Sequence, residues 1–137
     1  MVRTKNQIRS SKSKGSQMEL NTEHSLKAVY SDIKRMGGEG QYLQYDLISE
    51  RNLVVFECKF HKSISWNEAK KYFHKLITKK PTDYEPYLIF KSNQQPVLVM
   101  YLTEGRLTVR EFEAVFGVVF EKHKSVKFGK KFPGDEK

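Results

Sequence analysis

The segment "LVVFECKF", residues 53–60, most narrowly limits what this chain can fold into. Successive side chains of a β-strand point to opposite faces, so the segment separates into two sets. One face is entirely apolar: Val54, Phe56, Cys58 and Phe60. The other face holds Val55, Glu57 and Lys59, with the acid and the base roughly 6–7 Å apart at their Cα atoms. The segment therefore predicts a core strand that presents a carboxylate and an amine side by side, unless that face is a solvated sheet edge.

Helical and strand periodicities alternate along the rest of the chain. Helices are expected over about 16–35, 65–77 and 108–119, and strands over 41–49, 53–60, 87–90 and 96–102. The order α, β, β, α, β, β, α predicts an α/β fold: a mixed central sheet flanked by helices.

Short local patterns support the helices. Ser65 with Glu68, and Thr108 with Glu111, have the spacing of a capping box at a helix start. The glycines of "MGGEG", 36–40, are expected to end the first helix. Each helix then has an apolar face: Leu26, Val29, Tyr30 and Ile33; Trp66, Ala69, Phe73, Leu76 and Ile77; Phe112, Val115, Phe116 and Val119. We expect Trp66 to lie in the core or in a contact between two copies of the chain.

The composition favours a nucleic-acid partner. The 137 residues suit a single domain and carry a net charge of +9 at pH 7, which is typical of a protein that meets a polyanion, although charge for solubility alone is the alternative. A single cysteine excludes an intramolecular disulfide and a cysteine-based zinc site. The start has no apolar signal segment and no run is long enough to span a membrane, so a cytoplasmic or other intracellular location is expected.

Both ends of the chain are basic. We expect residues 1–14 to form a flexible arm, 15–120 the folded domain and 121–137 a basic C-terminal tail. The cations of the arm are Arg3, Lys5, Arg9, Lys12 and Lys14.

Asp46 gives the Glu57–Lys59 pair a chemical meaning. If the two strands pair through the turn at 49–52, Asp46 and Glu57 converge at one end of the sheet. Two close carboxylates repel unless a cation lies between them, and carboxylate oxygens are the ligands that Mg²⁺ prefers. Glu19, early in the first helix, is a candidate for a third acid; Glu23 is its rival, and a helix-dipole role for Glu19 is the alternative.

Three segments resemble, in order, the motifs of PD-(D/E)xK nucleases: "KGSQMELN" at 14–21, "YDLIS" at 45–49 and "LVVFECKF" at 53–60. The likeness is greatest to small archaeal-type (Hjc-like) and viral Holliday junction resolvases, and it extends over roughly residues 12–105 through "PVLVMYL". It implies a restriction-endonuclease-like fold. The chain differs from the family in "GGEGQYLQYD", where the usual serine and arginine before the aspartate are absent.

The resemblance implies roles for individual residues. Glu19, Asp46 and Glu57 would hold Mg²⁺, for which Mn²⁺ substitutes, with the Cys58 backbone carbonyl as a further ligand, and Lys59 would assist the attacking water. The implied activity is phosphodiester hydrolysis at four-way DNA junctions by a homodimer, in DNA recombination and repair, with no small-molecule cofactor and no membrane. Two alternatives remain open: a non-catalytic DNA-binding protein on the same fold, and a nicking or restriction-type nuclease of duplex DNA.

Basic residues close to the candidate site complete the predicted DNA surface. His61 and Lys62 follow the strand, and Lys70 and Lys71 lie on the next helix. We expect them to contact the phosphate backbone, the alternative for the lysines being a solvated helix face.

The basic arm generates a testable prediction. Each cation that neutralises a phosphate releases counterions, so deleting residues 2–12, with Arg3, Lys5, Arg9 and Lys12, should weaken junction binding. The slope of log affinity against log salt should become less steep by about 3 to 4. Titrations of labelled junction and linear duplex over a range of salt would measure this, and unchanged junction affinity at moderate salt would contradict a role for the arm.

Overall fold

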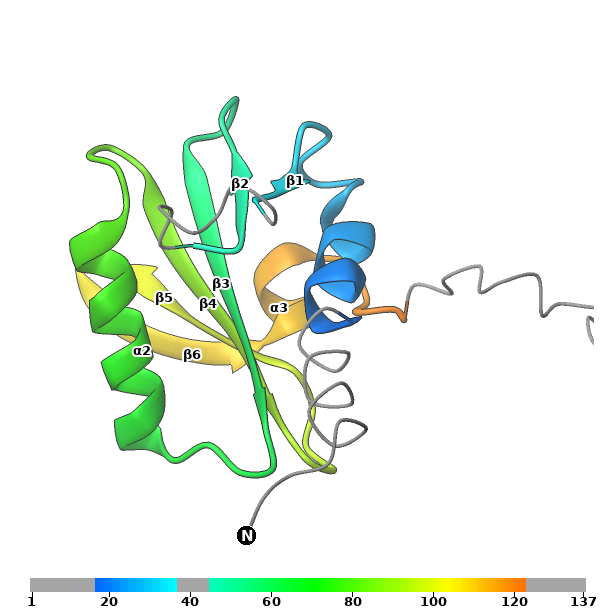
Figure 1. Ribbon diagram of the computed structural model, residues 1–137, viewed down its shortest axis with the longest axis vertical. Coiled ribbons are helices and arrows are strands. Elements are labelled where there is room, and N and C mark those ends of the chain that lie inside the picture. Colours follow the sequence, from blue (N-terminus) through cyan, green and yellow to red (C-terminus); the bar gives the residue numbers. More distant parts are fainter. Residues whose placement is uncertain (1–16, 37–44, 123–137) are drawn as a thin grey trace, which may run out of the picture.

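A computed structural model describes residues 17–36 and 45–122, which form a six-stranded sheet with helices on both faces (Figure 1). The strands are β1 (Lys34–Arg35), β2 (Leu47–Ser49), β3 (Val54–His61), β4 (Glu85–Ser92), β5 (Leu98–Thr103) and β6 (Arg106–Glu111). The helices are the first helix, with residues 17–26 described, α2 (Trp66–Lys79) and α3 (Phe112–Phe116). The predicted fold class, a mixed sheet flanked by helices, is confirmed.

The sheet follows chain order, β1-β2-β3-β4-β5-β6. Of the described strand pairs, only β3 and β4 run parallel to each other, and α2 is the crossover between them, because parallel neighbours need a long connection. α2 covers one face of the sheet, and the first helix and α3 cover the other. The central strand β3 is thus enclosed by helices on both sides.

The predicted alternation of β3 is confirmed. Val54, Phe56 and Cys58 pack in the core beneath the first helix and α3, whereas Val55 packs with Leu76 of α2. This alternation sends the side chains of odd-numbered residues toward α2.

The predicted start of α2 is also confirmed. The Ser65 hydroxyl accepts a hydrogen bond from the Glu68 N–H at 3.1 Å, and the Glu68 carboxylate accepts one from the Ser65 N–H at 2.8 Å. Trp66 does not lie in the core, since 51% of it is exposed; its alternative place, a contact between two copies of the chain, stays a prediction. The buried face of α2 begins one turn later, at Ala69, where the helix meets apolar side chains of β4 and β5.

The first helix is shorter than its apolar spacing predicts. It ends at Leu26, the chain turns, and Lys34–Arg35 form β1 against β2. The Asp32 carboxylate fixes this turn by accepting hydrogen bonds from the Ser49 hydroxyl and the Arg51 N–H. The spacing was misleading because residues beyond the turn still pack inward: Ile33 is buried, and Tyr30 contacts Phe56 with 5.5 Å between ring centroids.

The predicted helix over 108–119 is largely wrong. Thr108 and Glu111 belong to β6, which pairs with β5 through a two-residue turn at Glu104 and Gly105, both with positive φ. Pairing with β5 outweighs the local capping-box pattern, so α3 starts only at Phe112 and has no side-chain cap. Gly117, with φ of +79°, ends it in the left-handed conformation, and Val119 is 56% exposed.

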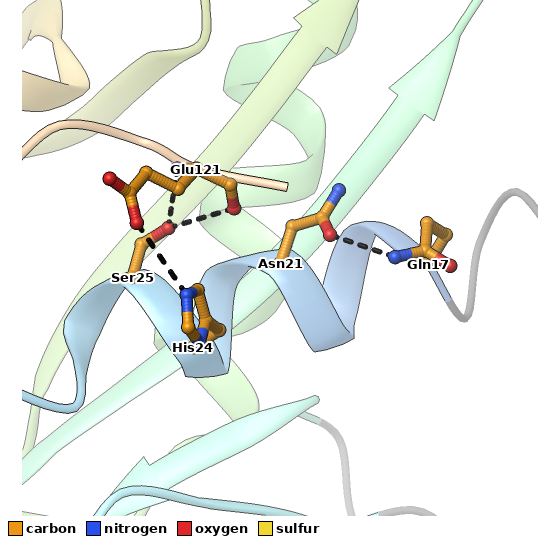
Figure 2. A network of polar contacts seen from close by, with 5 residues as sticks. All are labelled: Gln17, Asn21, His24, Ser25 and Glu121. Carbon is orange, nitrogen blue, oxygen red and sulfur yellow. Dashed lines mark hydrogen bonds and ion pairs between the residues drawn. The ribbon is translucent and has the colours of Figure 1, made fainter. Parts of the chain in front are cut away.

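The chain after α3 returns to the first helix. The Ser25 hydroxyl accepts a hydrogen bond from the Glu121 N–H at 2.8 Å and donates one to the Glu121 carbonyl at 3.2 Å (Figure 2). His24 lies 3.5 Å from the Glu121 carboxylate, and Gln17 donates to Asn21 on the same helix. Glu121, the first residue of the expected tail, is therefore bonded to the folded domain.

Several predictions concern residues that the structure does not describe. The arm over 1–14, residues 41–44 of the second predicted strand, the "GGEG" glycines and the tail from 123 lie outside the described residues. In the described ranges, no helix is long and apolar enough to cross a membrane.

The capping box at α2 can be tested directly. Ser65→Ala should lower the free energy of unfolding by about 1 kcal/mol, because the Glu68 N–H loses its acceptor. Urea unfolding measures this. Ser63→Ala, an exposed serine outside the cap, is the matched control and should change stability by less than about 0.5 kcal/mol; equal effects of the two substitutions would contradict the capping role.

Candidate active site

Asp46 lies at a β-bulge between β2 and β3. In register, Leu47 is opposite Phe56, yet the Asp46 N–H also donates to the Phe56 carbonyl at 2.9 Å. Two consecutive residues thus face one, and such a bulge redirects a side chain. It also explains why Tyr45 packs on the side of Ile48 and not, as the alternation predicts, on the side of Leu47.

The redirected Asp46 carboxylate lies along the edge of β3. Its Oδ2 accepts a hydrogen bond from the Cys58 N–H at 2.8 Å, at a point where β2 has already ended. The N–H and C=O of one strand residue point to the same side. The Cys58 carbonyl is therefore directed to the side of Asp46, as its expected role as a ligand requires.

Glu57 and Lys59 lie together beneath α2. The Lys59 Nζ is 3.4 Å from the Glu57 Oε2, and their side chains are 31% and 18% exposed respectively. Both side chains are partly buried, which argues against the alternative of a solvated pair, although β2 does not extend alongside Glu57 and Lys59.

Glu19 approaches the same place from the first helix. Its carboxyl lies close enough to Asp46 for each group to affect the pKa of the other, and its Oε1 lies 3.6 Å from the Arg35 Nε. The Arg35 pair exceeds hydrogen-bonding distance, and the buried Arg35 Nε has no hydrogen-bond partner. Of the two candidate acids on the helix, Glu19 is the one whose electrostatic contacts reach Asp46 and Glu57.

All three carboxyls have raised pKa values. Burial, followed by repulsion from Asp46, raises the pKa of Glu57 to about 7 despite the nearby Lys59 ammonium. Burial and Asp46 likewise raise the pKa of Glu19. Burial raises the pKa of Asp46 too, against the opposing effect of the Cys58 N–H. Burial and mutual repulsion of the acids therefore outweigh the opposing effects of the nearby Arg35 and Lys59 on these pKa values.

The donor set suits a hard divalent cation, but the side chains are not arranged to hold one. Within residues 17–36 and 45–122, no group of three His, Cys, Asp or Glu side chains has metal-binding geometry. Glu57 is turned to Lys59 and Glu19 to Arg35. Binding Mg²⁺ would require at least these two glutamates to exchange a basic partner for the metal.

The Cys58 thiol takes no part in this set. It is buried and lies 3.5 Å from the Thr22 hydroxyl, and burial raises its pKa well above the ordinary value. As predicted, the side chain points to the core, which leaves the backbone of Cys58 to face the site.

Sequence reasoning missed two residues of this site, Arg35 and Tyr72. The sequence predicts a first helix that runs to Arg35, which leaves no serine and no arginine between the helix and Asp46. In the structure the helix ends at Leu26, so the segment between the helix and Asp46 contains both Ser31 and Arg35. Tyr72 was given no role, yet the Lys59 Nζ lies 4.8 Å from its ring centroid. The i, i+3 and i+4 spacing predicts the buried face of α2. It does not predict which strand residue a side chain next to that face, such as Tyr72, will contact.

The predicted DNA-contacting residues lie on two neighbouring elements. His61 and Lys62 are exposed at the end of β3, and Lys71 is exposed on α2. The His61 and Tyr72 rings stack with 5.9 Å between centroids. Lys70 is only half exposed, with its Nζ 5.6 Å from the Trp66 ring centroid. Arg3, Lys5, Arg9, Lys12 and Lys14 lie outside the described residues.

Comparison with known proteins found little. No protein-family model and no curated protein matches the chain. It is similar to the solved structure of Hjc, a Holliday junction resolvase from the archaeal hyperthermophile Archaeoglobus fulgidus, with 17% identity, a TM-score of 0.43, and coverage of 79% of this chain and 99% of that chain. At that identity and TM-score the likeness establishes neither fold nor function, which rest on the residues of this chain.

The raised pKa of Glu57 predicts a pH-dependent stability. A folded pKa of about 7 against an ordinary 4.5 means that the folded state keeps a proton that the unfolded chain loses. This contribution is fully present below pH 4.5 and is lost as pH rises through 7. Glu57→Gln should therefore be more stable than the parent by about 3 kcal/mol at pH 8 and nearly equal to it below pH 4.5.

Urea unfolding at the two pH values measures the difference. Glu113→Gln, which removes an exposed carboxyl, is the control and should leave the pH dependence of the parent unchanged. A Glu57→Gln variant that is no more stable than the parent at pH 8 would show that the ionised Glu57 carboxylate does not destabilise the folded state.

Proposed function

We propose that this chain is a Mg²⁺-dependent endonuclease that cuts branched DNA and resolves four-way junctions. The observation that carries the proposal is the convergence of Glu19, Asp46 and Glu57 beside Lys59, with all three carboxyl pKa values raised. A domain without chemistry gains nothing from burying three mutually repelling acids.

The three acids and the Cys58 carbonyl would hold the metal, since all four supply oxygen ligands. A bound Mg²⁺ polarises a phosphoryl oxygen and lowers the pKa of its water. Mn²⁺, which accepts the same ligands, is expected to substitute.

The basic residues of the site have separate tasks. Lys59, 3.4 Å from Glu57, would orient the attacking water or offset charge on the phosphate as the bond breaks. Arg35, freed when Glu19 turns to the metal, has a buried Nε available for another acceptor, such as a phosphate oxygen.

The DNA would approach along β3 and α2. His61, Lys62 and Lys71 are exposed near the Lys59 end of the site, and the chain carries a net charge of +9. Symmetric cutting of a four-way junction needs two sites, so we propose that the active form is a homodimer.

A non-catalytic DNA-binding protein is the second candidate. It is favoured by the pairing of Glu57 with Lys59 and of Glu19 with Arg35, which offsets part of the negative charge without a metal. A nuclease that prefers ordinary duplex DNA is the third.

Cleavage assays separate the three candidates. Purified full-length protein is incubated with labelled four-way junction or with linear duplex of matched sequence, in Mg²⁺, in Mn²⁺ or in chelator. Paired symmetric nicks confined to the junction, and abolished by chelator, would support the proposal. Binding without cutting in either metal supports the second candidate, and equal cutting of both DNAs supports the third.

Two substitutions test the acids themselves. Asp46→Asn and Glu57→Gln should each lower the cleavage rate by at least about 10²-fold, because the metal loses a charged ligand. Junction binding should stay equal or become tighter, since fewer negative charges face the phosphates. Glu113→Gln serves as the matched control. Wild-type cleavage by Asp46→Asn would overturn the assignment.

A further inference from the structure

The Lys59 ammonium has two neighbours of different kinds. The Glu57 carboxylate lies 3.4 Å from Nζ, and the centroid of the Tyr72 ring lies 4.8 Å from it. An ammonium within about 6 Å of the centre of an aromatic ring is attracted by the electrons of that ring. Lys59 is therefore held both by a charged group and by a neutral ring.

The charged neighbour is the one that the proposed reaction would remove. If Glu57 turns to a metal ion, its carboxylate is shared with a divalent cation that repels the ammonium. Lysine has a flexible stem of four carbons and loses its position readily when its partner leaves. Asp46, whose charge also acts on Lys59, would be shared with the same metal ion. Among the described neighbours of Lys59, the Tyr72 ring is the one that would not be engaged by the metal.

Tyr72 is itself fixed from two directions. It directly precedes Phe73 on α2. The Phe73 side chain is fully buried and anchors this turn of the helix. Its ring stacks on His61, with 5.9 Å between centroids and 11° between planes, and its hydroxyl lies 3.4 Å from the His61 Nε2. The ring is thus held between α2 and the end of β3.

We propose that Tyr72, steadied by His61, is the residue that positions Lys59 at the site when Glu57 is engaged elsewhere. The contact itself stands on the geometry, whereas its consequence for cleavage rests on the proposed function. Tyr72 acts through Lys59 and needs no contact with the DNA.

The position of Lys59 can be read without any activity. In the full-length protein without metal, the Lys59 Cε protons should show an upfield ring-current shift in NMR spectra. Tyr72→Phe keeps the ring and should keep the shift, whereas Tyr72→Leu should abolish it. His74→Ala, an exposed position two residues along α2, is the control for a general disturbance of the helix. A Lys59 shift unaltered in Tyr72→Leu would overturn the proposal.

Kinetics then test the consequence. Tyr72→Leu should lower kcat about 3- to 30-fold, which corresponds to the strength of a partly buried cation–ring contact, with KM for junction DNA unchanged. Tyr72→Phe should recover most of the rate, which a loss of stability alone would not explain. Wild-type kcat in Tyr72→Leu would overturn the positioning role. If the parent does not cleave at all but the shift behaves as expected, the Lys59–Tyr72 contact stands and the proposed function fails.

Discussion

The hydrogen bond from the Cys58 N–H to the Asp46 carboxylate joins β2 and β3 at the point where their ladder ends. The Asp46 carboxylate here takes the place of a backbone carbonyl as acceptor. Asp46 therefore both links the two strands and belongs to the candidate site. The bulge that makes this bond possible sets Asp46 beside Glu57 and within reach of Glu19. The positions of Glu19 and Glu57 relative to Asp46 therefore depend on this hydrogen bond.

The site is held in place at a cost to the fold. Helices on both faces bury β3, and burial is the largest cause of the raised pKa of each of the three acids. Arg35 and Lys59 offset part of the charge from two sides. Such strain is common where a protein prepares ligands or catalytic groups, because the arrangement that suits the chemistry is not the one that maximises stability.

Sequence patterns correctly predicted the features that depend on interactions between residues close together in the chain. The alternation in β3 and the capping box of Ser65 and Glu68 were correct, because both depend on neighbours in the chain. The same reasoning failed for Thr108 and Glu111, where pairing with β5 decides the structure. It also extended the first helix to Arg35, since Ile33 is buried and Tyr30 partly buried after the turn. Val29, on the same predicted face, is exposed, so the spacing predicted the burial of most of these residues but not the backbone conformation.

By itself, the sequence determined that Glu57 and Lys59 share a face of a core strand, which follows from the two-residue period of a β-strand. The place of Asp46 beside them depends on the bulge before β2, which that period does not predict. Only the tertiary structure decided that Arg35 and Tyr72 belong to the same site. They reach it from β1 and α2 because the chain turns after Leu26 and crosses from β3 to β4. A one-dimensional period cannot encode which residues of separate elements meet, since that depends on how those elements pack.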